Sequence, residues 1–167
     1  MTHQGPWTAC LLALALMLGG CATKAPAAAT VAEPAGAGPW SGRLALQVED
    51  NQSQSFSAGF ELKGTAETGE LALLSPLGGT LARLAWSPKS ATLQANGQTR
   101  EFESVDALVT QATGSAIPVA ALFDWLRGVQ TPVAGWQADL SQIGSGKLRA
   151  ERLAPPPRAD LRVALDR

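Results

Sequence analysis

Apolar residues recur at every second position in several short segments from Trp40 onward, and this pattern constrains the fold more than any other feature. In the first segment, Leu44, Leu46 and Val48 alternate with small or polar residues. Successive side chains of a strand point to opposite faces, so such segments are typical of half-buried antiparallel strands. We expect nine strands, at residues 44–48, 56–62, 70–74, 80–86, 91–95, 99–102, 135–140, 147–153 and 161–165.

Two helices are expected between the sixth and seventh strands. The first begins after Ser104, a residue type that caps helix N-termini, and ends at Gly114. Its apolar residues recur at helical spacing, at Val105, Leu108, Val109 and Ala112. The second runs from Pro118, which suits a first turn, to Arg127 and Gly128, which suit a helix end. Its apolar residues at helical spacing are Val119, Leu122, Trp125 and Leu126.

A long meander of strands interrupted by one helix pair predicts a mainly β fold with helices. In such a fold the helices cover the concave face of a strongly curved sheet. The inside can enclose an apolar pocket, and the periodicity leaves open whether side chains fill it. We expect residues 40–167 to form this single folded domain.

The N-terminus is typical of a signal peptide. Residues 8–18 are apolar and lead into Leu18-Gly19-Gly20-Cys21. A helix of this length rises about 16 Å, whereas a membrane span needs roughly 20 residues, so we expect residues 1–20 to be a removed signal peptide. Leu-Gly-Gly-Cys resembles the lipobox of bacterial lipoproteins, which implies a diacylglyceryl group and a further acyl chain on Cys21. The alternative is an ordinary secretory signal followed by a chance cysteine.

The segment after Cys21 is predicted to be a flexible tether. Residues 22–39 consist almost entirely of Ala, Pro, Thr and Gly, which bury too little apolar area to offset chain entropy. We therefore expect residues 21–39 to be a lipidated tether that reaches at most about 60 Å when extended. Ala22, and not Asp, follows the cysteine, so the lipobox resemblance implies an outer-membrane anchor.

The composition excludes several classes of function. The only histidine, His3, and the second cysteine, Cys10, both lie in the predicted signal peptide, so the mature chain has no Ser-His-Asp or Cys-His catalysis and no His or Cys zinc site. Thirteen basic and fourteen acidic residues nearly balance, and no basic block suggests nucleic-acid binding. Asp124 sits beside two aromatic residues, and we expect it to be a solvated or capping carboxylate rather than a catalytic one. We expect no enzyme, no metal and no cofactor.

One loop places an apolar residue at a turn. In Ser75-Pro76-Leu77-Gly78-Gly79, proline and glycine force a turn between two strands, with Leu77 at its tip. Leu77 either folds back onto the core or stands exposed to solvent. Neither reading is excluded by the residues alone, because single exposed leucines are common.

Several blocks together resemble the LolB family of outer-membrane lipoprotein receptors. The blocks are Gly42-Arg43-Leu44-Ala45-Leu46, Ser75-Pro76-Leu77-Gly78, and Ile117-Pro118 with Leu122, Trp125, Leu126 and Gly128. The resemblance implies an incomplete, half-open antiparallel β-barrel covered by α-helices, as in LolA and LolB. It implies a receptor on the periplasmic face of the outer membrane that accepts acylated lipoproteins from the carrier LolA and inserts them into outer-membrane lipid. Leu77, with Pro76 and Gly78, matches the family's protruding loop, to which membrane insertion is ascribed.

Under this reading the acyl chains occupy an apolar cavity, and we expect a monomer. The expected lining residues are Leu46, Phe56, Phe60, Leu73, Leu84, Trp86, Leu122 and Trp125. Members of the family usually carry a helix before the Gly-Arg strand, whereas here the tether leads directly to Trp40. The competing hypothesis is a structural outer-membrane lipoprotein with a filled core and no lipid ligand. A third is an anchored hydrolase with two convergent carboxylates.

Overall fold

The computed structural model describes residues 38–49 and 54–166. The predicted signal peptide, Cys21 and nearly all of the predicted tether lie outside the described residues. Within the described ranges the chain is mainly β, with nine strands, two α-helices and one 3₁₀ turn. None of the helices in these ranges has the length and hydropathy needed to cross a membrane.

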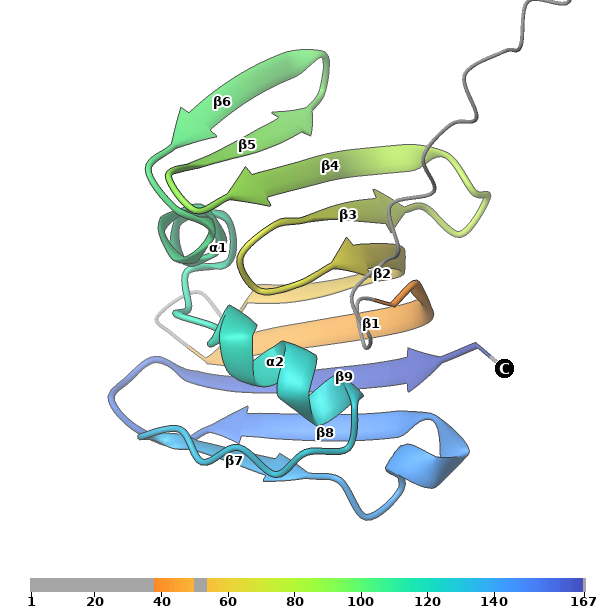
Figure 1. Cartoon of the computed structure of the whole chain (residues 1–167), viewed down its shortest axis with the longest axis vertical. Helices are drawn as coiled ribbons and strands as arrows, with labels where there is room; N and C mark the ends of the chain where they lie inside the picture. Colours follow the sequence, from red (N-terminus) through yellow and green to blue (C-terminus); the bar gives the residue numbers. More distant parts are fainter. Residues whose placement is uncertain (1–37, 50–53, 167) are drawn as a thin grey trace, which may run out of the picture. The chain divides into compact units, whose positions relative to one another are not determined.

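All nine predicted strands are present, with ends that differ by a few residues from the predicted ones. They form one antiparallel sheet in the order β6-β5-β4-β3-β2-β1-β9-β8-β7 (Figure 1). The strands are β1 (Trp40–Glu49), β2 (Gln54–Gly64), β3 (Gly69–Leu74), β4 (Thr80–Ser87), β5 (Ser90–Ala95), β6 (Gln98–Phe102), β7 (Trp136–Asp139), β8 (Lys147–Arg152) and β9 (Arg158–Leu165).

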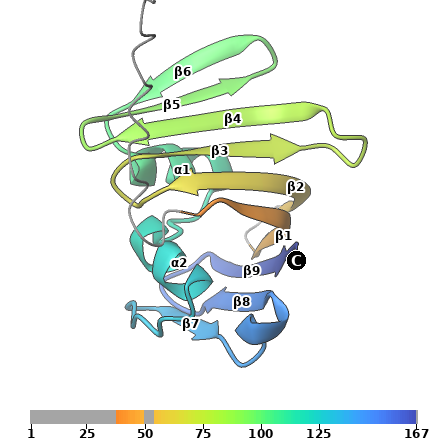
Figure 2. The ribbon, with the colours of Figure 1, turned by 45° about the vertical axis from the view of Figure 1, so that its right-hand side comes forward.

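The sheet is open, because its two edge strands, β6 and β7, do not pair with each other in the described structure. The last strand, β9, pairs with the first, β1, so the two ends of the domain meet in the middle of the sheet. The segment between β6 and β7 must therefore pass from one edge to the other. It carries both helices, α1 (Val105–Thr113) and α2 (Val119–Leu126), across one face of the sheet (Figures 1 and 2).

The helix ends follow the predicted signals. The Ser104 side chain accepts a hydrogen bond from the amide of Ala107, at 3.1 Å, which satisfies one of the free donors of the first turn of α1. Gly114 ends α1 in the left-handed conformation, with φ of 69°. Pro118 precedes α2, and Gly128 follows it with φ of 80°. Both helices are thereby confirmed.

The sheet buries the face that the helices cover. Leu62, Leu71, Leu84 and Leu93 are direct partners across β2 to β5 and form one apolar row on this face. The close approach of β9 to β1 requires one glycine: Gly42 has φ of 154°, and a Cβ there would lie 2.0 Å from the carbonyl oxygen of Ala164. Gly42 thus allows β1 to pair with β9.

Candidate functional site: an apolar cavity and an exposed leucine loop

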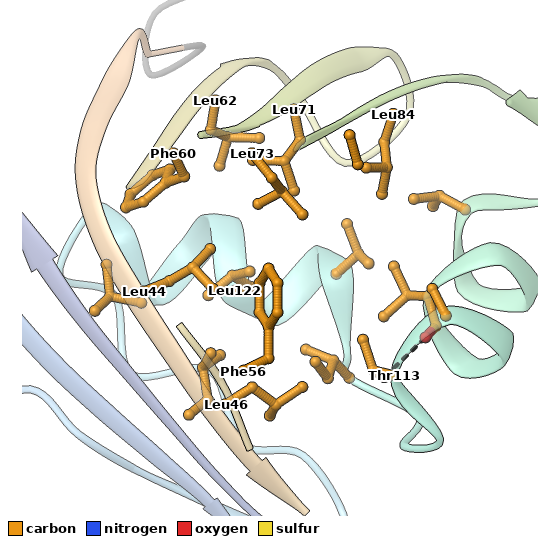
Figure 3. A pocket seen from close by; sticks show the side chains of 18 of the residues that line it. Leu44, Leu46, Phe56, Phe60, Leu62, Leu71, Leu73, Leu84, Thr113 and Leu122 are labelled. Atoms are coloured by element: carbon orange, nitrogen blue, oxygen red, sulfur yellow. Dashed lines mark hydrogen bonds between the residues drawn. The ribbon is translucent and has the colours of Figure 1, made fainter. Parts of the chain in front are cut away.

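A cavity of about 620 Å³ lies between the inner face of the sheet and the two helices (Figure 3). This volume falls within the range of roughly 300–1,000 Å³ that is usual for ligand pockets. The sheet contributes side chains from β1 to β5 and β9, and the rest come from both helices and from Ile117 between them. The open question of a filled or hollow core is therefore decided in favour of a hollow one.

The lining is almost entirely apolar and carries no charged side chain. Its polar side-chain groups are the hydroxyls of Ser55 and Thr113 and the indole N–H of Trp86. The Thr113 hydroxyl donates to the carbonyl of Val109 at 2.8 Å, drawn as the dashed line in Figure 3. The Trp86 indole donates to the carbonyl of Thr65 at 3.0 Å. Because these two groups already have protein partners, the wall presents mainly hydrocarbon to any occupant.

Seven of the eight residues that we expected in the lining are found there. They are Leu46, Phe56, Phe60, Leu73, Leu84, Trp86 and Leu122. Phe56 differs from the others because 40% of its surface is exposed, so the lining reaches solvent beside its ring. That the cavity takes acyl chains stays a prediction.

Trp125 was placed wrongly. It is 1% exposed but does not line the cavity; its indole N–H donates to the carbonyl of Thr131 at 3.0 Å, and its ring centroid lies 6.3 Å from that of Trp136. The α2 residues that do face the cavity have the spacing i, i+3, i+4 and i+7: Val119, Leu122, Phe123 and Leu126. Since α2 is buried on more than one side, its periodicity did not identify which apolar face meets the cavity.

Other lining residues were missing from the prediction. Leu44 and Val48 share the face of Leu46, and Leu62 shares that of Phe60, so the strand alternation already contained the signal. Val105 and Val109 of α1 belong to the apolar face identified from the sequence. Combining each strand or helix face as a whole, instead of selecting its largest residues, would have found them.

Asp124 has a structural environment. Its carboxylate accepts hydrogen bonds from the hydroxyl of Thr131, at 2.7 Å, and from the guanidinium of Arg127. The hydrogen bond from Thr131, and then that from Arg127, hold the pKa of this carboxyl below its ordinary value. Its backbone carbonyl accepts from the amide of Val129 at 2.9 Å. Asp124 thus organises the chain that follows α2, and it is absent from the cavity lining.

Leu77 is 98% exposed, at the tip of the loop between β3 and β4. The loop is closed by hydrogen bonds from the amide of Gly78 to the carbonyl of Ser75, at 2.9 Å, and from the amide of Ser75 to the carbonyl of Gly79, at 2.8 Å. The Ser75 hydroxyl also accepts from the amide of Gly79 at 3.1 Å. Pro76 and the left-handed Gly78, with φ of 82°, complete the turn. The structure therefore has the exposed alternative, with the leucine held outward by its own loop.

Comparison with known proteins identifies the family. Residues 39–152 match the family model described as "Outer membrane lipoprotein LolB". A protein of Bordetella petrii named "Outer-membrane lipoprotein LolB" is 34% identical over 91% of this chain and 88% of its own length. A relative of the same name from Chromobacterium violaceum is 34% identical over 73% of this chain and 68% of its own length. Another, from Bordetella pertussis, is 41% identical over 52% of this chain and 45% of its own length. The chain therefore belongs to the LolB family of outer-membrane lipoproteins.

Proposed function

We propose that this chain is a monomeric receptor that accepts acylated lipoproteins from the periplasmic carrier LolA and releases them into the outer membrane. Membership of the LolB family already makes it an outer-membrane lipoprotein localisation factor, in a family not known for enzymes. The observation that carries the finer proposal is the cavity of about 620 Å³ with no charged residue in its lining. We interpret the open sheet as an incomplete barrel whose open side the helices cover.

The energetics of hydrocarbon transfer support this function without catalysis. Each methylene removed from water contributes about 0.8 kcal/mol, so about ten methylenes in the cavity contribute about 8 kcal/mol. Moving the same methylenes from the cavity into a bilayer exchanges one apolar surrounding for another and changes the free energy little. Direction then requires only that the bilayer be a slightly better acceptor than the cavity.

The apolar wall of the cavity is itself a reason to bind hydrocarbon, because an acyl chain that covers this wall removes apolar surface from water. The chain also makes dispersion contacts with the lining side chains. The alternative of a scaffold lipoprotein requires a filled core, so the cavity disfavours that alternative.

The Leu77 loop supports the release step. A leucine that is almost fully exposed contributes nothing to the core, and its loop is rigidly hydrogen-bonded, so its exposure is built into the fold. Burying such a side chain in hydrocarbon yields roughly 1.5–3 kcal/mol. In our proposal Leu77 enters the bilayer and brings the cavity and its cargo to the membrane.

The experiment uses the mature chain with Cys21→Ala, which stays in solution, and LolA loaded with a labelled lipoprotein. Cargo pickup and delivery into liposomes are measured for this chain, for Leu77→Glu and for Leu153→Glu. Leu153 is a matched control because it is 51% exposed and lies beyond the end of β8, in another turn. We expect all three to take up cargo and only Leu77→Glu to fail in delivery. No pickup by any of them would refute the receptor function.

A further inference from the structure

Arg43 belongs to the Gly-Arg segment that resembles LolB, yet it takes no part in the cavity. Its neighbour Leu44 points inward and lines the cavity, so Arg43 lies on the outer face of β1. There it borders a groove of about 390 Å³ over β1, β9 and β8, which Ser57 of β2, Asp139 at the end of β7 and Gln142 complete. Two small residues in this groove, Ala45 and Ala164, leave room between long cationic side chains.

The groove contains two cations that lack an acidic partner. Arg43 and Lys147 face the same residue, Ala164, from the two sides of β9, which puts their Cα atoms roughly 10 Å apart. Neither of them forms an ion pair in the part of the chain that the structure describes. Both side chains are long and exposed, so they can converge on one anion above Ala164.

The other two arginines of the groove are already neutralised. Arg149 contacts Asp160 at 2.9 Å and Glu151 at 2.6 Å, and Arg162 contacts Asp160 at 2.6 Å. These contacts fix the two guanidinium groups beside the free pair. The one carboxylate in the lining is Asp139, which accepts a hydrogen bond from the amide of Ser141 at 2.9 Å. With the carboxylates of Asp160 and Glu151 counted beside Asp139, the groove and its ion-pair partners carry four cations against three carboxylates, and the excess positive charge lies at Arg43 and Lys147.

The position of the groove indicates what it meets. In Figures 1 and 2 the end of β9 and the start of β8 lie on the same side of the domain as the loop between β3 and β4, which carries Leu77. Arg43 also follows within three residues of Trp40, where the predicted lipidated tether ends. A cationic groove and an exposed leucine on one side of a membrane-anchored domain have the chemistry of headgroup and hydrocarbon contact.

We propose that the groove between Arg43 and Lys147 binds the phosphate of anionic phospholipid headgroups and so orients the domain on the bilayer. The proposal rests on the proposed function for the membrane step that it serves. Leu77 inserts into the hydrocarbon of the bilayer, and the groove determines which side of the domain faces the headgroups. Each basic residue near an anionic surface contributes a factor of about five to membrane partitioning, so the pair contributes about thirtyfold.

The test measures sedimentation of the mature Cys21→Ala chain with vesicles of phosphatidylcholine, alone or mixed with phosphatidylglycerol. The double variant Arg43→Gln, Lys147→Gln is compared with Lys63→Gln, Lys89→Gln, which removes two other exposed cations without described ion pairs. We expect the first variant to lose about thirtyfold in partitioning on the anionic vesicles and most of its salt dependence. The control variant should stay within a few-fold of the parent chain.

An equal loss of vesicle partitioning in both double variants would show that only the net charge matters, and would refute the proposed headgroup site. No loss in the Arg43, Lys147 variant would also overturn it and favour an acidic protein surface as the partner. Uptake of a fluorescent fatty acid is measured on the same samples as an independent readout. If the parent chain takes up no fatty acid but the two double variants still differ in vesicle partitioning, the proposed receptor function is refuted and the headgroup site is not. If the chain takes up fatty acid but the two double variants do not differ in partitioning, only the headgroup site is refuted.

Discussion

Ala82→Leu tests whether the cavity is hollow and whether its occupant competes with added protein carbon. Ala82 lies on β4 between its strand partners Leu73 and Ala95 and lines the cavity. Leucine adds three carbon atoms. In a close-packed core such an addition costs typically 1–3 kcal/mol, because neighbours must shift. In a cavity of about 620 Å³ the atoms instead enter free space and gain about 2 kcal/mol of burial, at about 0.8 kcal/mol each.

A matched substitution predicts the opposite sign. Ala91 lies on β5, is 0% exposed and does not line the cavity. Ala91→Leu adds the same atoms to filled space, so its free energy of unfolding should fall by about 1–3 kcal/mol. The same carbons in the Ala82 variant displace part of an acyl chain. The affinity for a fluorescent fatty acid should therefore weaken by about 2 kcal/mol, about thirtyfold in Kd.

The measurements are urea unfolding followed by tryptophan fluorescence, and titration with the fatty-acid probe. Stability is compared through the midpoint and slope of the transition, since an unchanged slope assigns the shift to stability. We expect Ala82→Leu to unfold at the same urea concentration as the parent chain, or at a higher one, and to bind the probe more weakly. Destabilisation of Ala82→Leu to the level of Ala91→Leu would refute a hollow core. Unchanged probe affinity in a stable variant would place the acyl site elsewhere.

Three further predictions concern the frame around the cavity. Gly42→Ala should lower the free energy of unfolding by at least about 2 kcal/mol in urea unfolding, because its Cβ would meet the Ala164 carbonyl at 2.0 Å; full stability would contradict this. Asp160→Asn should cost up to about 1 kcal/mol at neutral pH, since the hydrogen bonds from Arg149 and Arg162 hold the pKa of that carboxyl below its ordinary value. The difference from the parent should begin to shrink as unfolding is measured below about pH 4, and should vanish only below the lowered pKa of the folded carboxyl. Trp125→Phe should cost about 1–3 kcal/mol, because the Thr131 carbonyl loses its donor, yet leave the Kd for the probe unchanged; weaker probe binding would place Trp125 at the cavity after all.

Local signals determined the elements of this domain. Most strands alternate over several residues, as β1, β4 and β9 do, and Ser104, Gly114 and Gly128 mark helix ends through backbone chemistry that depends only on neighbouring residues. The lipobox and tether are likewise local patterns, and they remain predictions because they lie outside the described residues. The family blocks around Gly42 and Leu77 were also readable, since they combine turn residues and strand residues at fixed spacing.

The tertiary structure decided which apolar faces meet and which do not. Trp125 and Leu122 belong to the same apolar helix, but only Leu122 faces the cavity, because the chain from Thr131 to Trp136 covers the other side. The cavity volume depends on how far the helices stand from the sheet, which no periodicity encodes. The pairing of β1 with β9 brings Arg43 and Lys147, more than one hundred residues apart, to the two sides of Ala164. Such non-local contacts arise only when the strands are ordered in the sheet, and the cavity and the basic groove both depend on them.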